Sequence, residues 1–201
     1  MGLGLTMASH SPKSRFSLLS HNELETVLKW RNKPHIRQNM HHQNTITWAQ
    51  HSQWFETLKN DDSRLFFIFY QNDRPIGVLN FSQYPSMPDT LEWGCYIGED
   101  NVWPGSGLLL EIAALQFALE IESANALYAE VLSSNKSVIK LHTLFQYMPL
   151  EDGPSFVRDE EEHYVKRFKY NREQWQHNKA IVFTRLPKQI CAAARNIEFE
   201  V

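Results

Sequence analysis

The chain has little cysteine and no long apolar run, and each absence excludes a class of protein. Among 201 residues only Cys95 and Cys191 are cysteines. They are too far apart to suggest a disulfide framework or a zinc site. No apolar run is long enough to span a bilayer. Residues 1–12 have no basic start before an apolar core, so we expect a flexible leader rather than a secretory signal. One domain over residues 13–201 and a cytoplasmic location are the simplest expectation.

An excess of positive charge is also missing. Lysine and arginine together number 20 against 23 acidic residues, a net charge of -3, and no basic stripe is visible. We therefore expect no nucleic-acid partner. The nine histidines are scattered, and the adjacent His41 and His42 point in different directions in any regular element, so no metal is expected. A hydrophobic content of 42% is enough for one sizeable core.

The strongest local pattern lies at residues 101–119. Gly105 and Gly107 precede an apolar run with helical spacing, formed by Leu108, Ile112, Leu115 and Leu119. The pattern predicts a loop that leads directly into a buried helix. The first amides of a helix lack internal partners and lie at the positive end of its dipole, so they bind phosphate. The loop lacks the Lys-Ser/Thr of a nucleoside-triphosphate loop and the third glycine of the dinucleotide fingerprint. Taken alone, the two glycines also suit an ordinary strand-to-helix turn.

The remaining elements alternate in a way that is typical of an α+β fold. We expect strands over 15–19, 65–70, 75–84, 90–98, 126–132, 147–150, 163–170 and 180–184. We expect helices over 22–32, 35–40, 45–60, 135–145 and 171–178, a solvated acidic turn over 159–162 and a weak helix near the end. Gly94, inside the strand over 90–98, predicts a bulge or a close backbone approach. This order predicts a mixed, mostly antiparallel central sheet flanked by helices.

Two consecutive segments carry a family resemblance. Residues 127–135 and 137–147 resemble the E-V-x-x-x-N-x-x-A-I-x-L-Y-x-x-x-G-F pattern of GNAT acetyltransferases. Residues 30–35, 51–58, 93–96 and 164–175 resemble one branch, the enzymes that acetylate the 4-amino group of UDP-4-amino-4,6-dideoxy sugars in pseudaminic-acid biosynthesis.

This resemblance implies a three-layer GNAT fold, acetyl-CoA as co-substrate, a nucleotide-sugar amine as acceptor and a role in surface-glycan synthesis such as flagellin glycosylation. A homodimer is compatible with it. Ribosomal-protein N-terminal acetyltransferases share the fold and much of the opening helix pattern, so a protein acceptor stays open. A non-catalytic acyl-CoA-binding module also stays open. Its motivation is three departures from the family: Trp103-Pro104 for a basic or Gln residue, Gln146 for Gly and His142 for Tyr.

The coenzyme site is expected at two places. Backbone amides in the glycine loop would bind the pyrophosphate, and they belong to Trp103, Gly105, Ser106, Gly107 and Leu108. The resemblance places the thioester along the strand that ends at Gly94, Cys95 and Tyr96, where a freed backbone amide can polarise the carbonyl. By the same resemblance, Asn135 touches the pantetheine arm while it caps its helix.

Acetyl transfer to an amine also needs a base and a proton for the leaving sulfur. His142 occupies the position of the family's tyrosine acid, and an imidazolium is a competent donor near neutral pH. Glu130, in an otherwise apolar strand, is the first candidate base, and Glu92 is the second. Each can equally be an ordinary surface residue, and either base can act through water. Catalysis by proximity alone, with bulk water accepting the proton, is also open.

The acceptor side needs cations and ring surfaces for a UDP group. Arg31 and His51 match the positions that face the nucleotide sugar in the resembling branch, and Trp93 and Tyr96 can supply ring contacts. Arg37 is a further cation in the same region. The alternative for Arg31 is a solvated helix end, where a cation is favourable in any case.

Overall fold

The computed structural model describes residues 11–87, 89–158 and 161–201, and one mixed sheet runs through them. Its strands are β1 (Ser14–Leu18), β2 (Arg64–Gln71), β3 (Arg74–Gln83), β4 (Thr90–Ile97), β5 (Ala126–Leu132), β6 (Met148–Pro149), β7 (Ser155–Arg158), β8 (Glu161–Asn171) and β9 (Ile197–Glu200). The order is β6-β8-β5-β4-β3-β2-β1-β9, with β7 paired to β8. Only the β4–β5 and β1–β9 pairs are parallel. The predicted mixed, mostly antiparallel sheet is therefore confirmed.

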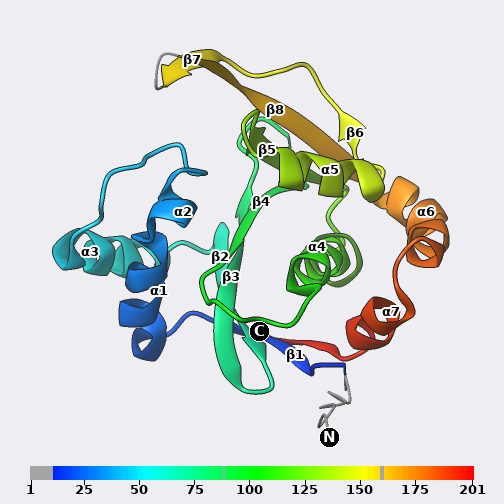
Figure 1. The fold of residues 1–201 in the computed structure, drawn as a ribbon, viewed down its shortest axis with the longest axis horizontal. Helices are drawn as coiled ribbons and strands as arrows, with labels where there is room; N and C mark the ends of the chain where they lie inside the picture. Colours follow the sequence, from blue (N-terminus) through cyan, green and yellow to red (C-terminus); the bar gives the residue numbers. More distant parts are fainter. Residues whose placement is uncertain (1–10, 88, 159–160) are drawn as a thin grey trace, which may run out of the picture.

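Helices cover both faces of this sheet (Figure 1). They are η1 (His21–Glu23), α1 (Leu24–Arg31), α2 (Pro34–Arg37), α3 (Trp48–Leu58), α4 (Ser106–Gln116), the π-helical turn η2 (Phe117–Ile121), α5 (Lys136–Leu144), α6 (Arg172–Thr184) and α7 (Lys188–Ala194). The first three α-helices lie on one face, and α4, α6 and α7 lie on the other. No helix among the described residues has both the length and the apolar character needed to cross a membrane.

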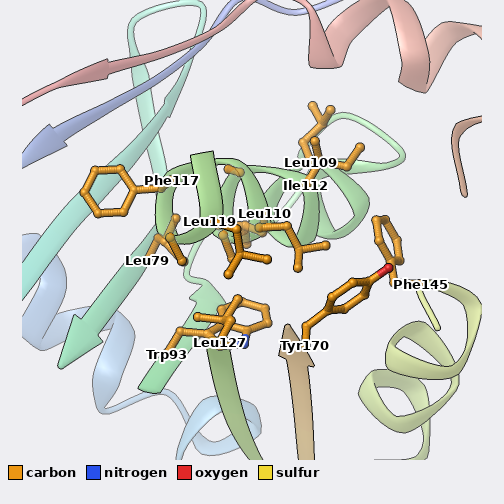
Figure 2. Packing of buried hydrophobic residues seen from close by; sticks show 14 of the residues in the cluster. Leu79, Trp93, Leu109, Leu110, Ile112, Phe117, Leu119, Leu127, Phe145 and Tyr170 are labelled. Atoms are coloured by element: carbon orange, nitrogen blue, oxygen red, sulfur yellow. The ribbon is translucent and has the colours of Figure 1, made fainter. Parts of the chain in front are cut away.

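Helix α4 is the centre of the main core. Its residues 109–115 are all buried, so the helix is enclosed on every side rather than along one stripe. Figure 2 shows Leu110 and Ile112 of this helix among side chains of the sheet, such as Leu79 and Trp93, and of the chain that follows α5. A fully buried leucine contributes about 1.5–3 kcal/mol to folding. The loop that precedes α4 is therefore anchored to the centre of the main core.

Two local predictions were wrong. The predicted strand over 180–184 is the second half of α6, which begins at the Asn171 and Gln174 capping box and buries Trp175 and Val182 seven residues apart on one face. The apolar triplet at residues 181–183 is compatible with either a strand or a helix, and its spacing from Trp175 follows the helical period. No bulge exists at Gly94, because β3 and β4 pair without a shift along their whole length.

Other predictions lie partly outside the described residues. The expected leader falls largely on residues 1–10, and the expected acidic turn falls partly on residues 159–160, which are not described. Glu161 and Glu162 belong to β8 rather than to a turn. The C-terminal β9 was not predicted; it adds a parallel strand beside β1.

Candidate active site

The sheet opens between β4 and β5. The two strands pair only from Thr90 opposite Ala126 to Glu92 opposite Tyr128. Beyond that point β5 stays paired with β8 as far as Leu132, while β4 continues against β3 to Ile97. The edge of β4 that follows Glu92 is therefore free of its parallel partner. A cleft of about 1100 Å³ lies here, with residues of both strands in its walls.

The start of α4 reaches the same cleft. Gly105 is the N-cap with φ of 114°, in the left-handed region that favours glycine. The Ser106 amide donates to the Trp103 carbonyl, and its buried hydroxyl donates to Gln71 Oε1 at 2.9 Å. Ser106 thus supports the loop and its amide is occupied. The amides of Gly107 and Leu108 have no acceptor among the described residues, and Gly107 lines the cleft.

Trp103 and the C-terminal helix support this loop from its other side. A β-carbon at Gly105 would overlap the side chain of Ile190 in α7 and would lie 2.9 Å from the Trp103 ring. The Trp103 side chain therefore packs behind the loop instead of lining the cleft. This position explains how an aromatic residue can replace the basic or Gln residue expected there.

Two carboxylates lie where the strands separate. Glu130 Oε1 accepts hydrogen bonds from the Tyr128 hydroxyl at 2.7 Å and from Arg167 Nε at 3.1 Å. The Glu92 carboxylate, by contrast, has no hydrogen-bond partner among the described residues. Burial, followed by the negative charge of Glu130, raises the pKa of Glu92 above its ordinary value. An unpaired carboxylate with a raised pKa suits a general base better than one held by Arg167.

His142 lies deep in the wall of the cleft. Its side chain is 1% exposed, stacks on the Tyr147 ring with centroids 4.4 Å apart, and has Nδ1 3.2 Å from Oε1 of Glu111, itself 1% exposed. Sequence analysis did not select Glu111. A carboxylate inside the run L-L-L-E-I-A-A-L, which is apolar on both sides of it, was the signal that could have found it.

The predicted acceptor residues occupy the other end of the cleft. His51 is buried, its Nε2 lies 3.1 Å from the Leu24 carbonyl oxygen, and burial lowers its pKa. Arg31 donates to the His42 carbonyl at 2.9 Å, while its other terminal nitrogen is enclosed and has no acceptor among the described residues. Burial also lowers the pKa of Arg31. Trp93 is 8% exposed and lies between the cleft and the main core.

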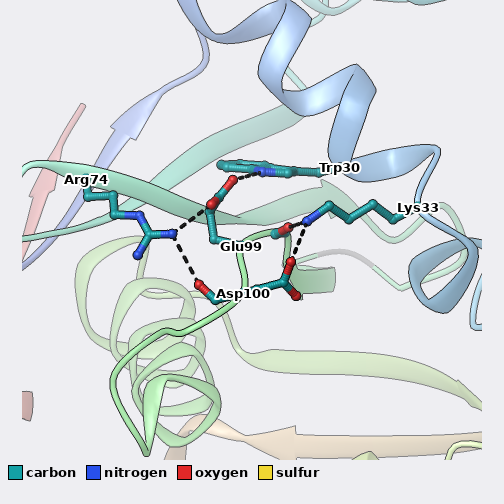
Figure 3. A network of polar contacts seen from close by, with 6 residues as sticks. Trp30, Lys33, Arg74, Glu99 and Asp100 are labelled. Carbon is teal, nitrogen blue, oxygen red and sulfur yellow. Dashed lines mark hydrogen bonds and ion pairs between the residues drawn. The ribbon is translucent and has the colours of Figure 1, made fainter.

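A polar network ties this acceptor end to the loop before α4 (Figure 3). Glu99 accepts hydrogen bonds from Trp30 Nε1 at 2.6 Å and from Arg74 at 2.7 Å. Lys33 Nζ donates to the Gly98 carbonyl at 2.7 Å and also contacts Asp100. The α1–α2 corner is thereby fixed to the end of β4.

Most of the predicted site residues thus line one cleft. They are Arg31, His51, Glu92, Trp93, Cys95, Tyr96, Gly107, Glu130, Asn135 and His142. Trp103, Gly105, Ser106 and Leu108 do not line it and instead shape the loop at its edge. Asn135 caps α5, as predicted, through its side-chain oxygen and the Val138 amide. Within the described ranges no group of three or more His, Cys, Asp or Glu residues is arranged to hold a metal.

The cleft thus combines an opened parallel strand pair with the free N-terminus of a buried helix. The Acetyltransferase (GNAT) domain model matches residues 15–144, and the chain belongs to this family of acetyltransferases. The chain is 31% identical over 141 residues to a protein named acetyltransferase PseH from Campylobacter jejuni subsp. jejuni serotype O:23/36 (strain 81-176), covering 70% of this chain and 87% of that one.

Solved structures share the fold at lower identity. A spermidine N-acetyltransferase from Vibrio cholerae in complex with CoA and spermine has a TM-score of 0.75 at 14% identity, covering 82% of this chain and 98% of the other. FdhC, described as a nucleotide-linked sugar GNAT, has a TM-score of 0.70 at 15% identity, covering 87% and 96%. These structures share the predicted fold, and the family model and the relatives at about 30% identity confirm the predicted resemblance to GNAT acetyltransferases.

Proposed function

We propose that this protein transfers the acetyl group of acetyl-CoA to the 4-amino group of a UDP-4-amino-4,6-dideoxy sugar. One observation carries the proposal: the free edge of β4, the unpaired amides that begin α4 and an unpaired carboxylate share one cleft. The relatives named acetyltransferase PseH and the local resemblance of residues 30–35 and 51–58 favour the sugar acceptor over other amines.

The coenzyme fits the residues present. The unpaired amides of Gly107 and Leu108, at the positive end of α4, would bind the pyrophosphate. The pantetheine arm would lie in the opening between β4 and β5, in reach of Asn135. Backbone along Trp93–Tyr96 would then meet the thioester, where an amide hydrogen can stabilise the oxyanion. Acetyl-CoA supplies the activated acetyl group.

The remaining chemistry is proton transfer. The neutral amine attacks the thioester carbon, and Glu92 accepts the proton that the nitrogen loses, directly or through water. When the carbon–sulfur bond breaks, sulfur keeps the electron pair, and His142 donates a proton to it. The order of the two candidate bases is thus reversed from the sequence prediction, because Glu130 is already held by Tyr128 and Arg167.

The function is tested by thiol release from acetyl-CoA with a panel of acceptors. The panel contains a UDP-4-amino-4,6-dideoxy-hexosamine, spermidine, basic and acidic N-terminal peptides and a blank without acceptor. We expect turnover and an acetyl mass gain on the sugar 4-amine. Turnover on peptides or spermidine alone would reject the sugar acceptor and keep the coenzyme site. Acetyl-CoA binding without turnover of any acceptor would reject the acetyl-transfer proposal for this panel and favour a binding module.

Arg31 should contribute to acceptor binding and Arg37 should not. The Arg31 guanidinium lines the cleft with one terminal nitrogen unpaired, whereas Arg37 donates to the Asn32 and Gln43 carbonyls and does not line it. A lost charged hydrogen bond costs about 1.5–3 kcal/mol. The Arg31→Gln variant should therefore raise the KM for the sugar by about 10- to 100-fold, with the KM for acetyl-CoA unchanged.

Arg37→Gln is the matched control. It removes the same charge in the same region, and we expect both KM values to stay close to wild type. Both arginines donate to carbonyls of the loop between α2 and α3, so thermal melting of each variant reports any loosening of that loop. Equal effects of the two variants on the sugar KM would show that Arg31 acts only by holding that loop.

A further inference from the structure

Glu111 is a carboxylate enclosed in the centre of the molecule. It lies in the second turn of α4, is 1% exposed, and is flanked by the buried Leu110 and Ile112. Among the described residues its only ion-pair partner is His142. The Tyr147 hydroxyl also interacts with the Glu111 carboxylate, whereas Nδ1 of His142 has no partner besides Glu111. A buried carboxylate is costly unless a proton or a cation compensates it. The fold nevertheless retains this one in the wall of the cleft.

The groups around the pair are neutral hydrogen-bonding or aromatic groups. Tyr147 stacks on the imidazole, Phe168 of β8 packs edge-on, and Trp93 of β4 lies 5.8 Å away, centroid to centroid. Tyr147, Tyr170 of β8 and Cys95 of β4 are the titratable side chains nearby. Burial, and then the charge of Glu111, raises the pKa of Tyr147 well above its ordinary value, so it stays protonated. No lysine or arginine is paired with Glu111 in the described part of the chain.

Two acceptor atoms cannot face each other at 3.2 Å without a proton between them. The 3.2 Å contact, and the lack of any other partner for Nδ1 among the described residues, place a proton between Nδ1 and Oε1. With Nδ1 engaged in this way, Nε2 is the only ring nitrogen left for chemistry, and His142 lines the cleft. The choice of nitrogen in a histidine is set by the partner of the other one.

We propose that Glu111 is a positioning residue that holds the Nδ1–H form of His142 and stabilises its imidazolium, so that Nε2–H protonates the departing thiolate. The inference rests on the proposed function and names a residue that the function did not require. In the step, the carbon–sulfur bond breaks and sulfur takes the pair. The Nε2–H proton moves to sulfur, and neutral His142 keeps its Nδ1 proton towards Glu111. Solvent then returns a proton to Nε2.

The first measurement does not depend on any acceptor. Nitrogen-15 NMR of histidine-labelled protein reports which ring nitrogen carries the proton, and the His142→Phe variant identifies the His142 signals by their loss. In wild type we expect the Nδ1–H form. In Glu111→Gln we expect a mixture with the Nε2–H form. Glu120→Gln is the matched control, because Glu120 follows on the same helical segment, pairs with Trp175 and Lys179, and lies outside the cleft. It should leave the His142 signals unchanged.

The second measurement is kinetic. Glu111→Gln should lower kcat about 100-fold, within the range of general acid catalysis, and leave the KM for acetyl-CoA within about twofold of wild type. In a His142→Tyr background the same change should have little effect on kcat, since a phenol has no tautomer to select.

Two results would overturn the inference. They are an unchanged tautomer ratio in Glu111→Gln, or an equal loss of kcat in the His142→Tyr background. If wild type acetylates no acceptor, the proposed function fails, while the NMR comparison still decides whether Glu111 sets the state of His142. Circular dichroism and acetyl-CoA binding of each variant separate these outcomes from misfolding.

Discussion

The Glu92→Gln variant should acetylate its acceptor about 100-fold more slowly than wild type and should also melt at a higher temperature at pH 7. The carboxylate is half buried, unpaired among the described residues, and close to Glu130, and these two causes raise its pKa. A carboxyl group whose pKa is higher in the folded chain contributes stability below its unfolded pKa and loses it as the pH rises through the folded value. At pH 7 the ionised side chain therefore lowers stability, and glutamine removes that cost.

The upward shift of the Glu92 pKa also sets how stability and activity change with pH. The stability gain should disappear as the pH falls towards the pKa of glutamate in an unfolded chain, about 4.3. The activity of wild type should rise with pH through the raised pKa of Glu92, since a base must be ionised. Melting curves from pH 4 to pH 8, with kcat over the same range, measure both.

Glu130→Gln is the informative control. It removes the carboxylate on the neighbouring strand, together with its hydrogen bonds to Tyr128 and Arg167. We expect kcat near the wild-type value and a rising limb shifted to lower pH, because the charge that raises the pKa of Glu92 is gone. If Glu130→Gln abolishes turnover while Glu92→Gln does not, Glu130 is the base.

Local features of the fold were predictable from the sequence. Asn135 caps its helix as expected, and Thr47 and Asn171 cap theirs in the same way, because a cap depends on two or three neighbouring residues. The glycine loop before α4 was also predictable, since the conformation at Gly105 and the apolar period both depend on residues within one short segment.

Long-range features were not predictable from local patterns. The separation of β4 from β5 after Glu92 depends on pairing between segments more than thirty residues apart in sequence. The side chains that contact Glu111, His142 of α5 and Tyr147, come more than thirty residues later, so its partner could not be read from its neighbours. The same reason explains why Glu130 was placed ahead of Glu92: Arg167, which holds it, lies 37 residues further along the chain.

Position 107 should separate coenzyme binding from folding. Gly107 is the second residue of α4, its amide has no partner among the described residues, and a β-carbon there would meet nothing within 4 Å. An aspartate in the first turn of a helix is favourable to the fold because of the helix dipole. Its negative charge at the same place should repel a pyrophosphate. Gly107→Asp should therefore weaken acetyl-CoA binding about 100-fold, equivalent to about 2.7 kcal/mol, with the melting temperature unchanged or higher.

Gly107→Ala and Gly105→Ala provide the two controls for this test. Gly107→Ala adds a β-carbon without charge and should change the Kd of acetyl-CoA by no more than about fivefold, less than 1 kcal/mol. Gly105→Ala should instead lower the melting temperature, by about 2–4 °C for each kcal/mol lost, because its φ of 114° is strained for alanine and the β-carbon would overlap Ile190. Calorimetric titration with acetyl-CoA and thermal melting of all three variants give the comparison. If Gly107→Asp binds acetyl-CoA as tightly as Gly107→Ala, the pyrophosphate does not lie at the start of α4. In that case the free edge of β4 would be the part of the coenzyme site that remains, and the phosphates would have to be sought elsewhere along the cleft.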